Sequence, residues 1–362
     1  MHASYPHLHP SYLHRMSDSI RQGLQRLAIP ASLRARGRFL TIVPIFGFLL
    51  LVSLVFAPSS VSGSQLENLL YFGAILGFAA LGQHLIITVG GLDLSVGPSM
   101  TLSALLFASN VGNGSASSTI NAIVLGLLGA GAVGLVNGFT VTVLRVTPLI
   151  ATLGGGAVGT GLAYTFVGQG APAAVPEAMG HFIADTTLGI IPTVAFFWAG
   201  FAIAATLILR LTVFGRRFTA VGANPRTSRA LGIPVDLYRG SAYVLGALLY
   251  GVGGIFLAIA VTTPGLGIGD SYLLPSISAV VIGGTALGGG LGSIGATFVG
   301  TLFVTQLNDF TLVVSGETAV QQIVQGAVIL AAMAIYSAHI DFGRIFSRDS
   351  AKAPALPPEQ PG

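Results

Sequence analysis

One carboxylate stands out among the residues whose chemistry could serve a function. Asp93 lies in the glycine-rich stretch GGLDLSVGPSM, residues 90–100, which joins two apolar segments. A carboxylate placed just before a helix accepts hydrogen bonds from the free N–H groups there, so Asp93 is predicted to cap a helix that starts at Leu94-Ser95. The alternative is that Asp93 lines or gates a path, because ionisable groups at membrane depth are candidates for function.

Four further polar side chains fall inside stretches that are otherwise apolar: Gln83, His84, Asn137 and Gln325. Such groups are candidates for lining a translocation path. Each has a second interpretation, in which it forms a hydrogen bond to a neighbouring helix. His84 has no set of ligand-type residues around it in the sequence, so no metal site is predicted.

A short basic helix is predicted inside the stretch RFTAVGANPRTSRALGI, residues 217–233. Asn224 is a good N-cap, Pro225 suits the first helical position, and Gly232 suits the position just past the end. One interpretation is an ordinary basic loop. The other is a rigid helix that docks into a groove of a soluble partner. The candidate docking residues are Gly222, Asn224, Pro225, Arg226, Arg229, Leu231 and Gly232.

Sequence signatures of an enzyme are missing. Lys352, the only lysine, is followed by Ala, whereas a phosphate-binding loop ends in Lys-Ser or Lys-Thr. The chain has no HExxH, no Cys, and no nucleophile paired with a base at membrane depth. We therefore predict a transport protein that is not an enzyme and has no cofactor. Its energy would come from another chain or from an ion gradient.

The composition places these residues in a membrane protein. Apolar residues make up 52% of the 362 and charged residues only 8%, far below the roughly 25% of soluble domains. A helix needs roughly 20 apolar residues to cross a bilayer. The predicted fold is therefore all-α, with about ten transmembrane helices, some of them broken or re-entrant. The candidate spans are 40–57, 66–89, 94–111, 119–144, 148–168, 189–210, 240–262, 272–288, 292–310 and 319–339.

The basic residues predict an orientation. Ten crossings with a cytoplasmic N-terminus place all 16 Lys and Arg on the cytoplasmic side, as the positive-inside bias expects. Both termini are then cytoplasmic. We predict a basic, disordered tail over 1–38, a transmembrane domain over 39–340 and a cytoplasmic tail over 341–362. No nucleic-acid partner is predicted, because the charges sit in the tails and connections rather than on a binding face.

Three stretches resemble a known family. GGLDLSVG is similar to the GGIDLSVG signature of the ribose-type sugar permeases of ATP-binding-cassette importers, and GANPRTSRALGI resembles their cytoplasmic GxNxxAAxxxGI segment. AVVIGGTALGGGLGSIGATFVGTL resembles a third family motif, and the three occur in family order over roughly residues 40–340. We group the candidate gating residues of the first and third motifs as Gly90, Gly91, Asp93, Ser95, Gly97, Gly283 and Gly284.

The resemblance implies a permease in the bacterial inner membrane that works as a pair, of two copies or of two related chains. Two ATPase subunits would dock from the cytoplasm, and an extracytoplasmic binding protein would deliver a monosaccharide such as ribose, xylose or galactose. Docking would fall on Gly222, Asn224, Arg229 and Gly232. The membrane lipid is the remaining partner.

Departures from the family pattern leave the solute open. The family usually has an acidic segment before AVVIGGT, whereas this chain has YLLPSIS at 272–278, with Tyr272 and Leu274 in place of the carboxylates. The nearest acid is Asp270, and His84 stands where the family tends to have a small residue or Thr. Two alternatives remain: a related permease for a branched-chain amino acid or nucleoside, and a gradient-driven carrier without an ATPase.

Overall fold

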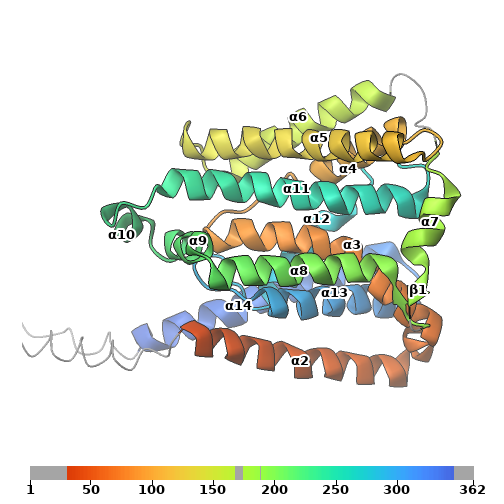
Figure 1. Cartoon of the computed structure of the whole chain (residues 1–362). Coiled ribbons are helices and arrows are strands. Elements are labelled where there is room, and N and C mark those ends of the chain that lie inside the picture. Colours follow the sequence, from red (N-terminus) through yellow and green to blue (C-terminus); the bar gives the residue numbers. More distant parts are fainter. Residues whose placement is uncertain (1–30, 168–173, 188, 346–362) are drawn as a thin grey trace, which may run out of the picture.

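The computed structural model describes residues 31–167, 174–187 and 189–345, and within them the chain is almost entirely helical (Figure 1). The predicted all-α membrane fold is confirmed. The helices are α2 (Ala31–Phe56), α3 (Gly63–Thr88), α4 (Val96–Asn110), α5 (Ala116–Thr142), α6 (Pro148–Val167), α7 (Glu177–Ala184), α8 (Thr193–Leu211), α9 (Val213–Ala223), α10 (Pro225–Ala230), α11 (Val235–Val261), α12 (Leu273–Ile282), α13 (Ile294–Ser315) and α14 (Thr318–Ile345). Two 3-10 turns, η1 (Pro58–Val61) and η2 (Asp270–Tyr272), and a two-stranded ribbon of β1 (Thr186–Thr187) and β2 (Ile191–Pro192) complete the described part.

Each of the ten predicted spans contains one helix, but the helices differ in length. Counting only the residues that the structure describes, five are long and apolar enough to cross a membrane: α3, α5, α8, α11 and α13. Helix α12 has only 10 residues, and the predicted span 272–288 is helical only as far as Ile282. The glycine-rich segment 283–293 that follows contains no helix, so this span is interrupted, in line with the expectation that some helices are broken or re-entrant. The number of crossings stays a prediction.

Several helices extend past the predicted boundaries. Helix α2 begins at Ala31, inside the predicted tail 1–38, and α14 continues to Ile345, past the predicted limit of 340. Apolar content marks the part of a helix that suits lipid, whereas backbone hydrogen bonding can continue into water on either side. Residues 1–30 and 346–362, which hold most of the two predicted tails, lie outside the described residues.

Helix α3 forms the centre of the bundle. Its most apolar 18 residues are 83% buried, compared with 28% in α5 and 22% in α8. Helix α11 packs against α3, α4 and α5. Glycines allow this close packing, because a methyl group at Gly82 would overlap the ring of Tyr250 and the carbonyl of Gly246. Small residues at helix contacts are what membrane helices use to approach closely.

The outer helices carry the apolar surface. Large side chains of α5 and α8 are exposed, among them Leu128, Leu135, Ile203 and Leu207. An exposed apolar belt of this kind suits a lipid environment. In Figure 1, α2 begins and α14 ends at the same end of the bundle as α9 and α10, and α7 with β1 lies at the opposite end.

Candidate functional site

The three glycine-rich motifs meet at the end of the bundle where α9 and α10 lie. Gly222, near the end of α9, faces the carbonyl oxygen of Thr88 and the amide of Gly290 so closely that a methyl group there would overlap both. The Gly290 N–H donates to the Thr88 carbonyl at 2.8 Å. Gly289 approaches the backbone of Gly90 and the carbonyl of Gly222. We call this contact of residues 88–90, 222–223 and 288–290 the glycine junction.

The geometry of the junction requires glycine. Gly289 and Gly290 have φ angles of +86° and +75°, which residues with a side chain rarely adopt. The junction places the predicted docking stretch directly on the C-terminal end of α3 and on the segment between α12 and α13. A displacement of α9 would therefore press on both.

Asp93 lies just before α4 and has no exposed surface. Its Oδ1 accepts hydrogen bonds from the Ser95 amide at 2.7 Å and from the Ser95 hydroxyl at 2.6 Å. The prediction that Asp93 caps this helix is wrong: α4 begins at Val96 with Ser95 as its N-cap, and Asp93 instead holds the turn before the helix through its bonds to Ser95. The Asn137 side-chain amide donates to the Ser95 hydroxyl at 2.8 Å, which ties α5 to this turn.

The other oxygen of the Asp93 carboxylate, Oδ2, has no hydrogen-bond partner in the part of the chain that the structure describes. The gating role of Asp93 stays a prediction. Among its companions in the motif, Gly91 would overlap the Tyr243 hydroxyl if it carried a methyl group, and Gly97 would overlap Asp270. Gly283 faces the first turn of α13, and Gly284 has a φ of +76°.

The predicted path residues separate into two groups. Gln83, His84 and Asn137 are buried and bond to neighbouring elements: the Tyr250 hydroxyl donates to Gln83 Oε1 at 2.7 Å, and His84 Nδ1 lies 2.8 Å from the Thr297 hydroxyl. These contacts fit the second interpretation, in which such groups join helices, although Gln83 Nε2 and Asn137 Oδ1 have no hydrogen-bond partner within the described residues. Gln325 lies apart from them, on α14; it too is buried, and its Nε2 donates to Asn308 Oδ1 on α13.

Gln325 lines a cavity of about 380 Å³, within the range of roughly 300–1,000 Å³ typical of ligand pockets. We call it the polar cavity. Helix α3, the η2–α12 segment, α13 and α14 enclose it. Its lining residues are Phe72, Leu76, Asp270, Ser271, Tyr272, Leu274, Pro275, Thr305, Asn308, Asp309, Thr318, Gln321, Gln322 and Gln325.

The polar cavity contains groups that the sequence did not single out for the path. Asp309 and Asn308 come from α13, and Asp270 comes from η2. Tyr272 and Leu274, which stand in place of the family's carboxylates, also line it. The two carboxylates of this cavity thus lie at other positions of the chain. The one sequence signal for this cavity is that polar residues recur late in α13 and early in α14.

The short helix predicted in the docking stretch is present as α10, and its docking role stays a prediction. The Asn224 side chain accepts from the Thr227 amide at 3.1 Å, Pro225 opens the helix, and Gly232 follows its end with a φ of +75°. Leu231 is 75% exposed. The sequence did not predict α9, which precedes α10 and is capped by the Thr212 hydroxyl, an acceptor for the Gly215 amide at 3.1 Å.

Arg229 of α10 has a partner within the chain. Its guanidinium lies 3.2 Å from the carboxylate of Asp236 in the first turn of α11, and Arg145 lies 3.2 Å from the same carboxylate. Arg226 is exposed. The described part of the chain contains no group of three or more residues arranged to hold a metal ion.

Comparison with known proteins decides the family. The family described as "Branched-chain amino acid transport system / permease component" matches residues 65–333. The chain belongs to this permease family. The permease is 33% identical over 299 residues to the ribose import permease protein RbsC of Bacillus subtilis (strain 168), which covers 80% of this chain and 90% of that protein.

Other relatives carry names of the same kind. The permease is 29% identical to the L-arabinose ABC transporter permease protein AraH of Azospirillum brasilense, over 84% of this chain and 90% of that protein. It is 29% identical to the galactose/methyl galactoside import permease protein MglC of Escherichia coli (strain K12), over 77% of this chain and 88% of that protein. No solved structure matches the permease significantly.

Proposed function

We propose that the permease is the membrane subunit of an ATP-binding-cassette importer that carries a monosaccharide into the cell, and that a separate ATPase subunit powers it. The observation that carries this proposal is the match over about nine tenths of the length of relatives named as ribose, arabinose and galactose permeases. The ATPase docks on α10, a binding protein delivers the sugar at the opposite end, and a second permease subunit completes the assembly in the inner membrane.

The polar cavity supports a sugar as the solute. Carboxylates and side-chain amides accept hydrogen bonds from hydroxyl groups, and Asp270, Asp309 and Gln322 supply such acceptors. The rings of Phe72 and Tyr272 offer apolar faces beside them. A neutral solute with many hydroxyls matches this lining.

The family description favours a second candidate, because it names branched-chain amino acids. A branched-chain amino acid carries both a carboxylate and an ammonium group. The two carboxylates of the cavity would attract the ammonium group, but they would repel the carboxylate, and the lining has no Arg, Lys or His to pair with it. The lining of the polar cavity therefore favours the sugar.

Reconstitution tests the proposal. The full permease, its ATPase and its binding protein are placed in vesicles, and uptake of labelled ribose, arabinose, galactose and leucine is measured. We expect ATP-dependent uptake of one sugar and none of leucine. Uptake of leucine alone would support the second candidate, and uptake by the permease without an ATPase, abolished by an uncoupler, would identify a gradient-driven carrier.

Variants locate the path. Asp309→Asn should lower sugar uptake several-fold while the ATPase still assembles with the permease, because loss of a charged hydrogen-bond acceptor weakens binding of hydroxyl groups. Glu177→Gln makes the same chemical change at an exposed position on α7, outside the cavity. Because α7 lies at the end proposed to receive the binding protein, this variant serves as the matched control once its binding of that protein is measured to equal that of the wild type. Equal uptake by wild type and Asp309→Asn would remove the polar cavity from the path.

A further inference from the structure

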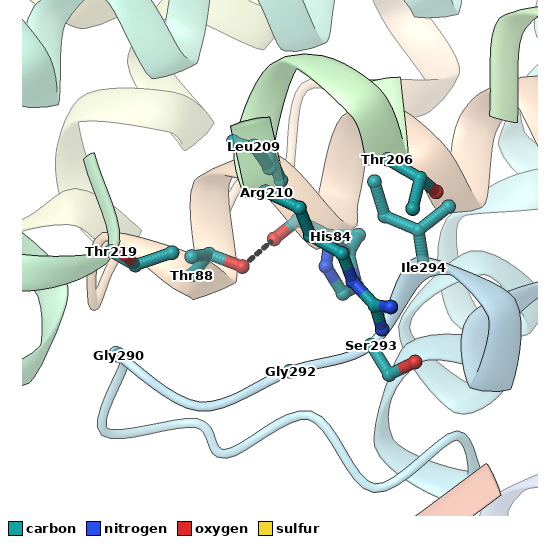
Figure 2. A pocket seen from close by; sticks show the side chains of 10 residues that line it. All are labelled: His84, Thr88, Thr206, Leu209, Arg210, Thr219, Gly290, Gly292, Ser293 and Ile294. Atoms are coloured by element: carbon teal, nitrogen blue, oxygen red, sulfur yellow. Dashed lines mark hydrogen bonds between the residues drawn. The ribbon is translucent and has the colours of Figure 1, made fainter. Parts of the chain in front are cut away.

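A second cavity, of about 90 Å³, lies near the glycine junction (Figure 2). Helices α3, α8 and α9 and the start of α13 enclose it, together with the end of the glycine-rich segment. Its lining residues are His84, Thr88, Thr206, Leu209, Arg210, Thr219, Gly290, Gly292, Ser293 and Ile294. None of these is acidic. A cavity with basic and hydroxyl groups and no carboxylate favours an anion.

Arg210 supplies the positive charge. Figure 2 shows its side chain extending from α8 past His84 towards Ser293. Arg210 is exposed, like Arg217, but it lines the cavity; within the described residues its guanidinium forms no ion pair and no hydrogen bond. A guanidinium has five N–H donors in a planar fork that matches the oxygens of a phosphate group.

His84 adds a buried donor. Its side chain is 2% exposed and lines the cavity. The Nδ1 atom lies 2.8 Å from the hydroxyl of Thr297 and 3.2 Å from that of Thr285. In the tautomer in which a threonine hydroxyl donates to Nδ1, the ring proton lies on Nε2, and the proposal below uses this tautomer. Among the described residues no hydrogen bond is formed by Nε2, so in this tautomer it can donate to a ligand.

The start of α13 contributes a third element. Ser293 is the N-cap and Ile294 the first residue of this 22-residue helix, and both line the cavity. The free N–H groups and the positive dipole end of a helix attract anions. Arg210, His84 and this helix end come from three separate elements, so their donors approach the cavity from different directions.

We propose that this cavity binds a phosphate group. A tetrahedral phosphate has acceptor oxygens on every side and suits donors that converge from several elements. Two sources share this chemistry: the headgroup of an anionic phospholipid and inorganic phosphate. The headgroup is favoured because Leu207, Ile208 and Leu211, beside Arg210 on α8, are exposed apolar residues that can contact acyl chains. Basic pockets between membrane helices on the cytoplasmic side are known lipid sites.

Native mass spectrometry of the full permease tests the proposal. Detergent-purified protein is titrated with phosphatidylglycerol in one series and with inorganic phosphate in another. We expect saturable binding of one phosphatidylglycerol per chain, and about tenfold weaker binding to Arg210→Gln, because this change removes charge-assisted hydrogen bonds. Arg217→Gln removes the same charge from an exposed residue of α9 that does not line the cavity, and it should bind as the wild type does.

The remaining outcomes are equally informative. If the permease binds inorganic phosphate, and Arg210→Gln weakens this binding while Arg217→Gln does not, the site is supported and its ligand is free phosphate. A second variant, His84→Leu, should also weaken binding, provided that its thermal unfolding shows a folded protein. Absence of saturable binding of either probe to the wild type, or equal binding by Arg210→Gln and Arg217→Gln, would overturn the proposal.

Discussion

Gly222 lies directly against the backbone carbonyl of Thr88, although the two residues are 134 positions apart in the sequence. The contact joins α9, which leads into the exposed α10, to the last residue of the central helix α3. The Thr88 carbonyl also accepts the hydrogen bond from Gly290 at 2.8 Å. A single peptide group thus holds both the docking stretch and the segment that connects α12 to α13.

We expect Gly222→Ala to destabilise the permease. The added methyl group would overlap backbone atoms of Thr88 and Gly290, and backbone cannot move aside as a flexible side chain can. Overpacking of this kind typically costs about 1–3 kcal/mol. Thermal unfolding in detergent, followed by the fluorescence of Trp198, the only tryptophan, measures the effect.

Gly154→Ala is the matched control for this experiment. Gly154 lies in α6, and a methyl group there would meet nothing within 4 Å. Alanine favours a helix over glycine by about 1 kcal/mol, so this variant should unfold at the wild-type temperature or above it. Equal unfolding temperatures for Gly222→Ala and Gly154→Ala would show that the junction can relax without cost.

Replacement of Asp93 separates its two interpretations. Asp93→Ala leaves the buried amide and hydroxyl of Ser95 without their acceptor, which typically costs about 1–3 kcal/mol. Asp93→Asn keeps an oxygen for both bonds, so we expect it to retain most of the stability. Unfolding temperatures of the two variants check this order.

Uptake in vesicles then distinguishes a structural role of Asp93 in this turn from a role in gating. If Asp93 serves only to hold the turn before α4, Asp93→Asn should carry solute at nearly the wild-type rate. If the negative charge itself takes part in gating, the same variant should fold normally and lose uptake. An Asp93→Asn protein as unstable as Asp93→Ala would contradict the proposed role of the Ser95 bonds.

The sequence predicts local features of this fold well. The N-cap at Asn224, the Pro225 helix start and the Gly232 stop each depend on neighbouring residues, and all three occur as predicted. The glycine junction could not be predicted, because it brings together three segments that only the packed helices place side by side. The polar cavity could not be predicted from the sequence for the same reason, because Asp270 and Asp309 lie on different elements and both line the cavity only in the folded chain.

The ion pair between Arg229 and Asp236 should contribute little to stability. Their side chains are 54% and 42% exposed, and exposed ion pairs are typically worth about 0–1 kcal/mol. We therefore expect Arg229→Ala and Asp236→Asn each to change the free energy of unfolding by less than about 1 kcal/mol. Unfolding curves for both variants measure this.

The same two variants test docking. If Arg229 contacts the ATPase, Arg229→Ala should lower ATP-driven uptake, whereas Asp236→Asn should leave it near the wild-type rate. Equal losses in both would mean that Arg229 acts only by orienting α10 on α11. Unchanged uptake in both would remove Arg229 from the docking surface.

Single-cysteine labelling tests the orientation of the bundle. The sequence has no cysteine, so each introduced thiol is the only one in the protein. Thr227→Cys places a thiol on α10, where the side chain is exposed, and Ser117→Cys places one in the exposed first turn of α5. Figure 1 shows these two helix segments at opposite ends of the bundle.

With basic residues concentrated around α9 and α10, the positive-inside bias predicts that α10 faces the cytoplasm. A membrane-impermeant maleimide should therefore label Ser117→Cys in intact cells and label Thr227→Cys only after the membrane is opened. Labelling of Thr227→Cys in intact cells, alone or together with Ser117→Cys, would contradict the cytoplasmic location of α10 on which docking of the ATPase depends.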